Sequence, residues 1–307
     1  QKLAQHRALL ARVRERFGVP PEYVIAIWRI ESGFGANFGN FSVIESLATL
    51  AYSGRRQDFW RRELIAALRL AERGEVPVSR LIGSWAGAMG HTQFMPSAYL
   101  SRATDFDGDG RRDLWSSLPD VFASTANYLS QAGWAGDLPF GVEVRLPGNF
   151  PYEMAETTQQ PVAAWSQLGV TQADGRPLPA WPGDTGIVVP AGHKGPAFLV
   201  SPTFRAILDY NNAAAYALAV GLFAERLRGG GRVAKPWPTG DRMLSRTEKE
   251  ELQRLLAERG FDPGKVDGQI GPASRAAIRT FQKKTGMPAD GYADQAFLEL
   301  VRRAPRP

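Results

Sequence analysis

Cysteine is absent from the 307-residue sequence, which excludes disulfide bonds, thiolate metal sites and cysteine nucleophiles. Long hydrophobic runs are also absent. The longest nearly continuous apolar stretch covers residues 213–224, whereas a helix that spans a bilayer needs about 20 such residues. The sequence therefore predicts no transmembrane segment. Histidine is scarce, and His6, His91 and His193 are too scattered to be assigned a role.

Positive charge is not clustered, although the net charge is +6 and the pI is about 9.7. Lysines and arginines are spread along the whole chain. Proteins that bind nucleic acid usually carry their basic residues in a patch or stripe. We therefore expect no nucleic-acid partner, whereas a mildly basic surface suits a polyanionic substrate.

The residue pattern predicts a mainly α (α+β) fold class. The length is enough for two or three domains. Helical periodicity dominates before residue 136 and returns at 204–228, and glycines follow the expected helices. Between these stretches, prolines and glycines recur around short β-type runs. We expect a helical core (1–135 and 201–228), a small β-rich insertion (136–200), a Gly- and Pro-rich linker (229–242) and a separate helical module (243–303).

Glu31 is the first candidate for chemistry, because it ends a helix expected from Glu22 onward after two prolines. The negative end of the helix dipole disfavours a carboxylate there. Apolar neighbours such as Ile27, Trp28 and Ile30 predict a surrounding of low dielectric. Both effects raise a carboxyl pKa, and a carboxylic acid still protonated near neutral pH suits cleavage of glycosidic bonds. The alternative is a surface glutamate that merely ends a helix.

A glycine-rich segment at 83–90 runs into the sequence HTQFMPSAY. Glycines allow close approach of the backbone, either to a ligand or to another helix. Ser84 and Gln93 offer a hydroxyl and an amide for hydrogen bonds, while Trp85 and Tyr99 have rings that could stack on sugars. Tight packing without a ligand is the alternative.

A third segment, YNNAAAY from Tyr210 to Tyr216, begins a helix that continues with apolar residues. Its polar and aromatic start indicates that this end faces a cleft. The alternative is a solvated first turn.

An acidic loop with the sequence DFDGDGRRD matches the start of an EF-hand loop, with Asp105, Asp107 and Asp109 at alternate positions. Arg111 would add only its backbone carbonyl. The twelfth position is a serine, and Asp120 lies further on as a substitute ligand. We expect a structural Ca²⁺ rather than a sensor site. The alternative is an Asp-Gly turn without metal.

Together, ESGFG, GSWAGAMGHTQFMPSAY, DFDGDG with ANYL, and YNNAAAYALAV resemble the lytic transglycosylases of the membrane-bound type B class across residues 20–228. The resemblance implies a lysozyme-like catalytic core of the goose type. It implies Glu31 as the single general acid/base. It also implies substrate contacts by Ser84, Gln93, Tyr128, Tyr210, Asn211 and Tyr216.

The implied reaction cleaves the β-1,4 bond between N-acetylmuramic acid and N-acetylglucosamine in peptidoglycan without water, forming 1,6-anhydromuramyl ends, and needs no cofactor. A hydrolytic muramidase is one alternative, because ordinary glycosidases use two carboxylates and Glu45 or Asp58 could be the second. A non-catalytic protein that binds the cell wall is the other alternative.

Residues 249–301 resemble the three-helix peptidoglycan-binding module of bacterial wall enzymes. A tethered binding module raises the effective concentration of an enzyme on an insoluble polymer. We expect glycan strands and stem peptides as partners, and other cell-wall enzymes as further ones. The substrate implies the periplasm of a Gram-negative cell, with the protein either soluble or anchored by a segment that this chain lacks.

Overall fold

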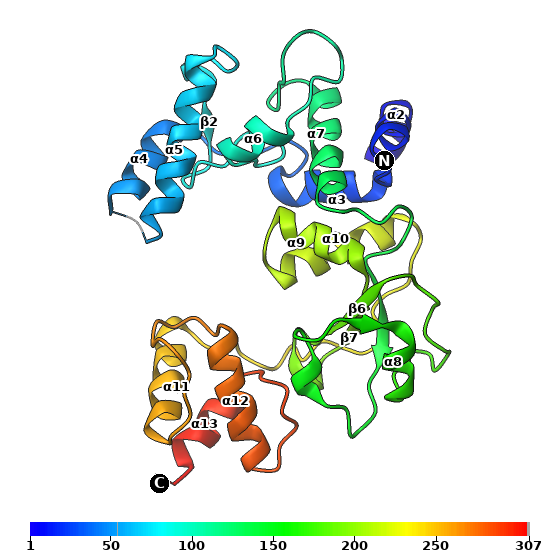
Figure 1. Cartoon of the computed structure of the whole chain (residues 1–307), viewed down its shortest axis with the longest axis vertical. Helices are drawn as coiled ribbons and strands as arrows, with labels where there is room; N and C mark the ends of the chain where they lie inside the picture. The colour runs from blue at the N-terminus through cyan, green and yellow to red at the C-terminus, as the bar shows by residue number, and fades with distance from the viewer. Residues whose placement is uncertain (54, 306–307) are drawn as a thin grey trace. The chain divides into compact units, whose positions relative to one another are not determined.

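The computed structural model describes residues 1–53 and 55–305 and divides into two compact units (Figure 1). Unit 1 comprises Gln1–Pro139 and Pro202–Gly231, and unit 2 comprises Phe140–Ser201 and Arg232–Pro307. Helices predominate and strands are confined to small sheets, which confirms the predicted fold class. Among the described residues, no helix is long and apolar enough to span a membrane.

The regular secondary structure of unit 1 is mainly helical. Its strands β1 (Phe41–Ser42) and β2 (Ile82–Gly83) pair in antiparallel fashion. Its α-helices are α1 (Lys2–Gln5), α2 (Arg7–Phe17), α3 (Pro21–Ser32), α4 (Val43–Ser53), α5 (Gln57–Glu72), α6 (Pro96–Arg102), α7 (Leu118–Gln131), α9 (Pro202–Tyr210) and α10 (Ala214–Leu227).

The helix expected over 204–228 is in fact two helices. The chain leaves helical geometry after Tyr210, and Ala213 is extended at φ −134° and ψ 118°. Asn211 and Asn212 occupy the break, which fits the preference of asparagine for turns and helix ends over helix interiors. The two predicted tyrosines therefore lie on separate helices, Tyr210 at the end of α9 and Tyr216 in the first turn of α10.

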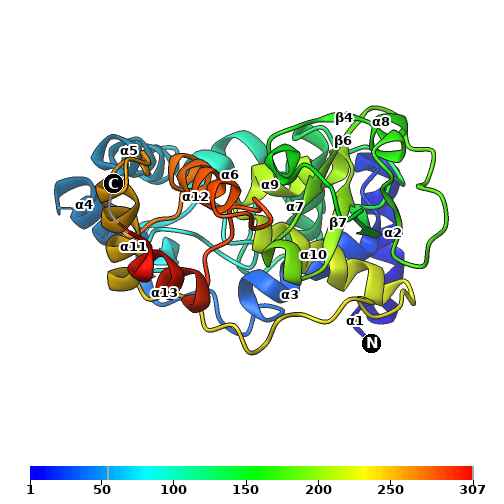
Figure 2. The ribbon, with the colours of Figure 1, turned by 90° about the horizontal axis from the view of Figure 1, so that it is seen from below.

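Helix α3 has sharply defined ends. Pro21 occupies its first position, where the missing N–H costs nothing. At its other end Gly33 is left-handed, with φ 61°, and the N–H groups of Gly33 and Phe34 bond to Arg29 and Trp28 carbonyls. Most of the helix is buried, and α10 packs beside it (Figures 1 and 2). Pro21 and Gly33 thus determine where α3 begins and ends.

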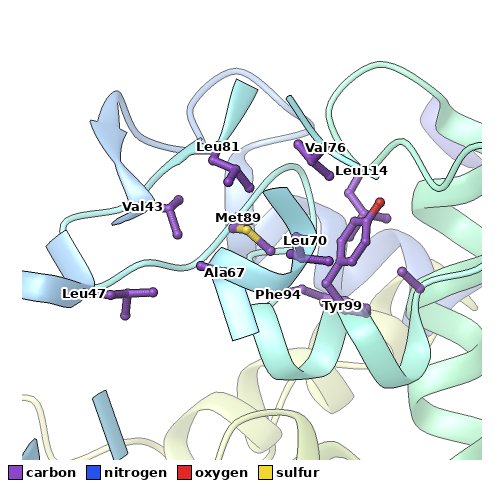
Figure 3. Close-up of a cluster of buried hydrophobic side chains, with 11 residues drawn as sticks. Val43, Leu47, Ala67, Leu70, Val76, Leu81, Met89, Phe94, Tyr99 and Leu114 are labelled. Carbon is purple, nitrogen blue, oxygen red and sulfur yellow. The ribbon is translucent and has the colours of Figure 1, made fainter. Parts of the chain in front are cut away.

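A hydrophobic cluster joins α4, α5 and α6 to the loops between them (Figure 3). Its fully buried members include Leu47, Leu70 and Met89. Burying a large apolar side chain such as leucine or methionine contributes about 1.5–3 kcal/mol to the free energy of folding. The cluster therefore gives the glycine-rich segment at 83–90 a rigid support.

Unit 2 contains a five-stranded sheet in the order β4-β6-β7-β3-β5, with antiparallel neighbours. Its elements are β3 (Gly141–Arg145), β4 (Gln160–Pro161), α8 (Val162–Gln167), β5 (Thr171–Gln172), β6 (Asp184–Val188) and β7 (Ala197–Val200). Trp165 of α8 is fully buried against this sheet, and its indole N–H donates to the Thr185 carbonyl at 3.2 Å. The β-rich character predicted for this region is present.

The C-terminal part of unit 2 holds three helices, α11 (Arg246–Glu258), α12 (Pro272–Lys284) and α13 (Gln295–Arg303). A capping box joins Ser245 and Glu248 at the start of α11. The three helices share a core that includes Leu252, Ile278 and Leu298. This is the three-helix arrangement expected for the C-terminal module.

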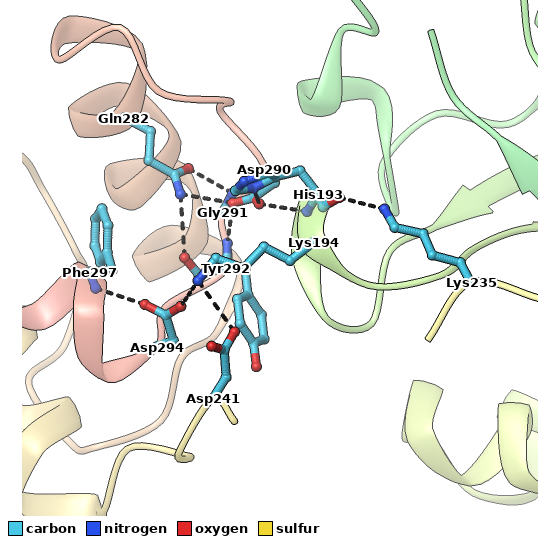
Figure 4. A network of polar contacts seen from close by, with 10 residues as sticks. All are labelled: His193, Lys194, Lys235, Asp241, Gln282, Asp290, Gly291, Tyr292, Asp294 and Phe297. Atoms are coloured by element: carbon cyan, nitrogen blue, oxygen red, sulfur yellow. Dashed lines mark hydrogen bonds and ion pairs between the residues drawn. The ribbon is translucent and has the colours of Figure 1, made fainter. Parts of the chain in front are cut away.

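A polar network ties this module to the β-rich part within unit 2 (Figure 4). The buried Asp290 carboxylate accepts the backbone N–H of His193 at 2.8 Å and the Gln282 amide at 2.8 Å. Lys194 contacts Asp294 at 2.6 Å.

The segment at 229–242, predicted as a linker, is also bonded to the β-rich part. The backbone N–H groups of Ala234 and Lys235 donate to the Glu143 carboxylate at 2.6 and 2.7 Å. At these residues the segment is thus fixed to strand β3.

Candidate active site

Glu31 lies in the last turn of α3, as predicted, and meets a residue of α10. The Tyr216 hydroxyl donates to Glu31 Oε1 at 2.5 Å. Burial raises the pKa of Glu31 from 4.5 to about 7, while the hydrogen bond from Tyr216 acts in the lowering direction. A carboxyl group with this pKa carries its proton in about half of the molecules at neutral pH.

The cause of this shift agrees with the sequence prediction only in part. Ile27 and Trp28 are buried, at 0% and 2% exposure, and supply the expected apolar surrounding. Ile30 does not, because it is 38% exposed. Burial is thus the dominant cause of the raised pKa, with α3 and α10 packed around the carboxyl group.

Three predicted tyrosines form an aromatic row that ends at Glu31. The ring of Tyr216 lies nearly parallel to that of Tyr210, with centroids 6.4 Å apart, and Tyr210 contacts Tyr128 at 4.6 Å. The charge of Glu31 adds to burial in raising the pKa of both Tyr210 and Tyr216, which places Tyr210 in the electrostatic range of the acid. The structure thus brings together side chains from α3, α7, α9 and α10.

Hydrogen bonds hold two of these rings in place. The Tyr210 hydroxyl donates to the Thr92 carbonyl at 2.6 Å, and the Tyr128 hydroxyl donates to the Asp209 carbonyl at 2.9 Å. The Arg102 guanidinium covers the Tyr128 ring at 4.0 Å. Asn211 is exposed in the break that follows Tyr210. The row is therefore a preorganised aromatic surface.

Ser84 lies at the start of the glycine-rich segment and Gln93 lies three residues after its end, and both side chains bond to its backbone. The Ser84 hydroxyl oxygen accepts the N–H groups of Ala86 and Ala88, at 3.3 and 3.1 Å. Gln93 has a positive φ of 52°, and its amide donates to the carbonyls of Gly90 and Phe38, at 2.9 and 3.1 Å. The amide of Gln93 thus also ties the segment to the loop after α3.

The glycines of this segment are needed for packing. A Cβ on Gly83 would lie 2.0 Å from the Ala88 carbonyl oxygen, and one on Gly87 would lie 2.6 Å from the Leu47 side chain. Close backbone packing, the alternative considered above, therefore explains these two glycines.

The two aromatic residues expected to stack on sugars differ in how exposed their side chains are. Trp85 is 64% exposed and available for such a contact. The expectation for Tyr99 is wrong, because its ring is fully buried in the hydrophobic cluster and its hydroxyl donates to the Arg112 carbonyl (Figure 3). Tyr99 lies on the face of helix α6 that packs against the hydrophobic cluster.

A contact between Trp28 and His91 was missed by sequence reasoning. The Trp28 indole N–H donates to His91 Nδ1 at 2.9 Å, so the neutral ring carries its proton on Nε2. A Cβ on Gly35 would lie 2.1 Å from this ring. The GFG sequence after Glu31 was the available signal, because a glycine often marks close approach of another group.

Neither candidate for a second carboxylate acts on Glu31. Glu45 and Asp58 are exposed in the first turns of α4 and α5, and Asp58 pairs with Arg61 at 3.5 Å. The shift in the Glu31 pKa has burial and Tyr216 as its causes.

The acidic loop brings Asp105, Asp107 and Asp109 together, with one carboxylate oxygen of each within 4.8 Å of the others. Asp120 is buried next to this group and accepts the backbone N–H groups of Phe106 and Asp113, at 2.7 and 2.8 Å. Burial and the charges of Asp107 and Asp105 raise the pKa of Asp120. Converging oxygen ligands of this kind fit a hard divalent cation, whose charge would offset the mutual repulsion of these carboxylates.

Comparisons with known proteins cover nearly the whole chain. Residues 1–225 match the family described as "Transglycosylase SLT domain", and residues 245–301 match a peptidoglycan binding domain. Membrane-bound lytic murein transglycosylase B of Escherichia coli K12 is 33% identical over 231 residues, which are 70% of this chain and 59% of that protein. The chain thus spans less than two thirds of that relative's length.

Solved structures give the same family relationship. SltB3 from Pseudomonas aeruginosa in complex with NAG-anhNAM-pentapeptide has a TM-score of 0.94 and 53% identity, over 98% of this chain and 81% of that chain. Slt35 from Escherichia coli in complex with calcium has a TM-score of 0.65 and 29% identity, over 74% of this chain and 72% of that chain. These likenesses confirm the predicted lysozyme-like core and C-terminal helical module.

Proposed function

This chain belongs to the transglycosylase SLT domain family, and from that membership we propose that it is a peptidoglycan lytic transglycosylase with Glu31 as its single general acid/base. The observation that carries the proposal is the buried Glu31 carboxyl with a pKa of about 7, held by Tyr216. The crystallised relative SltB3 binds NAG-anhNAM-pentapeptide, and an anhydromuramyl group is the end that the proposed reaction forms.

The reaction proceeds in two proton transfers. Protonated Glu31 first gives its proton to the bridging oxygen of the β-1,4 bond, so that the bond from this oxygen to C1 of the muramic residue breaks. The Glu31 carboxylate then takes the proton of the C6 hydroxyl, whose oxygen bonds to C1 and closes the 1,6-anhydro ring. The enzyme ends protonated, and no water or cofactor is consumed. Because a pKa near 7 matches both steps, one carboxyl group can perform them in turn.

Glycan contacts come from the aromatic row and the glycine-rich segment. Tyr128, Tyr210 and Tyr216 bring aromatic rings together from three helices, and flat apolar ring faces suit the C–H faces of sugar rings. Of their hydroxyls, that of Tyr216 bonds to Glu31. Ser84, Gln93 and Asn211 add hydrogen-bonding groups to this site.

The C-terminal module, within residues 243–303, binds peptidoglycan and holds the enzyme on its substrate, with stem peptides as further ligands. A peptidoglycan substrate implies the periplasm as the working compartment. We also propose other cell-wall enzymes as partners. For the functional division we keep the sequence-based hypothesis of a core in 1–135 and 201–228, an insertion in 136–200 and a linker in 229–242.

The acidic loop holds a structural Ca²⁺. Asp105, Asp107 and Asp109 supply carboxylate oxygens, Arg111 supplies its backbone carbonyl, and Asp120 completes the set. The Slt35 relative was solved in complex with calcium, which supports this choice of ion. The ion orders the loop and takes no part in the bond cleavage.

The test is mass spectrometry of the soluble products released from purified peptidoglycan by the parent protein and by Glu31→Gln. The proposal expects products lighter by one water than hydrolysed fragments from the parent and none from the variant. Hydrated products would favour the muramidase. Absence of products from both, with the protein still pelleting with peptidoglycan, would favour a wall-binding protein.

A further inference from the structure

A cavity of about 530 Å³ lies in unit 1 beside the acidic loop, and it is lined by arginines. Its charged lining consists of Arg73, Arg80, Arg111, Arg112, Glu75 and Asp113. Val76 and Trp115 contribute apolar surface. None of these residues belongs to the group around Glu31.

Positive charge is in excess in this cavity. Glu75 pairs with Arg112 and also with Arg73, at 3.6 Å, while Asp113 pairs with Arg80 at 3.4 Å. Four guanidinium groups therefore face two carboxylates. An anionic ligand would relieve the repulsion.

The wall of the cavity is rigid before any ligand arrives. The Tyr99 hydroxyl donates to the Arg112 carbonyl, and the Trp115 indole donates to the Ile82 carbonyl at 3.0 Å. Val76 is part of the buried hydrophobic cluster (Figure 3). Because these groups are already fixed, a ligand would lose little affinity to ordering of the protein.

Among anions, a carboxylate on a peptide fits the lining well. Guanidinium groups bind carboxylates through paired N–H donors. The Asp113 carboxylate is already occupied by the N–H groups of Trp115 and Ser116 and by Arg80, so it does not compete for the guanidinium groups of the other arginines. Trp115 offers an apolar face for side chains of the peptide. The ligand of the relative SltB3 includes a pentapeptide, which by its chemistry ends in a carboxylate.

We propose that this arginine-lined cavity binds a carboxylate-bearing peptide of the peptidoglycan strand, at a site separate from that of glycan cleavage. The inference rests on the proposed function, because that function supplies the peptide-bearing substrate. The N–H of His91, the residue that follows the glycine-rich segment, donates to the carbonyl of Leu114, next to Trp115 in the sequence, at 2.9 Å. A peptide held here would therefore engage the same unit that cleaves the glycan.

The test measures binding of the pentapeptide Ala-Glu-Lys-Ala-Ala by calorimetry at low salt. The comparison ligand carries Gln in place of Glu and an amidated C-terminus, so that its carboxylates are gone. The cavity variant is Arg73→Gln/Arg80→Gln, two exposed arginines whose ion pairs contribute little to stability. The matched control, Arg62→Gln/Arg69→Gln on α5, removes the same charge from exposed positions outside the cavity lining.

We expect about tenfold weaker binding of the acidic peptide to the cavity variant, near-parental binding to the control, and no detectable binding of the amidated peptide. Equal losses in both variants, equal binding of the two peptides, or no binding to the parent would each overturn the proposal. Cleavage of peptide-free glycan is measured in parallel on all three proteins. None of the four substituted arginines is among the residues proposed to act on the glycan, so absence of this activity in the parent protein would instead contradict the proposed function.

Discussion

The Tyr216 hydroxyl donates a 2.5 Å hydrogen bond to Glu31 Oε1, and the two residues are 185 positions apart in the sequence. The bond stabilises the ionised carboxylate, whereas burial stabilises the protonated acid. The pKa of about 7 results from these opposing effects. Glu31 is thus balanced between the acid and the base that the two proton transfers require.

Replacing Tyr216 by phenylalanine should raise the pKa of Glu31 further, because burial would then act without the opposing hydrogen bond. We expect the alkaline limb of the activity profile to move upward by about one pH unit, and the maximal rate to fall about tenfold from poorer orientation of the acid. Initial rates of product release between pH 5 and 10 measure both. Tyr128→Phe is the control, because the Tyr128 hydroxyl donates to the Asp209 carbonyl and not to Glu31. If the alkaline limb of Tyr216→Phe stays where it is in the parent, the hydrogen bond from Tyr216 does not set the pKa of Glu31.

The parent protein should lose activity as the pH rises through about 7, because the first step needs protonated Glu31. Rates on peptide-free glycan test this, with circular dichroism at each pH to confirm that the protein stays folded. An activity that is flat between pH 6 and 9 would mean that a different group donates the proton.

Glu31 should also make the folded state sensitive to pH. Its folded pKa of about 7 exceeds its ordinary value of 4.5, so the native state binds more protons between these values and stability falls as the pH rises through them. From the difference between these two pKa values, the loss of folding free energy by pH 8 is at most about 3.4 kcal/mol. Urea unfolding of Glu31→Gln should therefore show a gain over the parent that is larger at pH 8 than at pH 5. An equal difference at both pH values would refute a raised pKa.

Calcium should stabilise the protein without changing its products. Free Ca²⁺ at about 100 times its dissociation constant would add about 2.7 kcal/mol to the free energy of unfolding. A chelator should lower the melting temperature of the parent, and Asp107→Asn should respond less. Asp137→Asn, an exposed aspartate outside the loop, is the control. If calcium shifts the melting temperature of Asp107→Asn as much as that of the parent, the ligand assignment fails.

Local signals in the sequence located much of the fold and the place of Glu31 in it. Pro21 and Gly33 define α3, so the position of Glu31 at its end could be predicted. The three aspartates of the acidic loop are neighbours in sequence, so their convergence needed no knowledge of the fold. Strand β7 at Ala197–Val200 coincides with one of the β-type runs of the sequence.

Features that depend on long-range packing could not be predicted. The burial of Tyr99 depends on which face of α6 turns toward the core, and the contact of Trp28 with His91 joins residues 63 positions apart. The fixed contact of the C-terminal module with His193 likewise depends on Asp290, which is buried only in the folded unit. No periodicity in the sequence reports such pairs.

The central claim is that Glu31 alone cleaves the glycan without water, and digestion in heavy-oxygen water tests it most directly. A hydrolytic lysozyme digest serves as the positive control, because each bond that it cleaves gains one solvent oxygen at the new muramyl end. For this protein we predict anhydromuramyl ends with no heavy oxygen, and no products from Glu31→Gln. Heavy oxygen at the new muramyl end would contradict the account and establish hydrolysis.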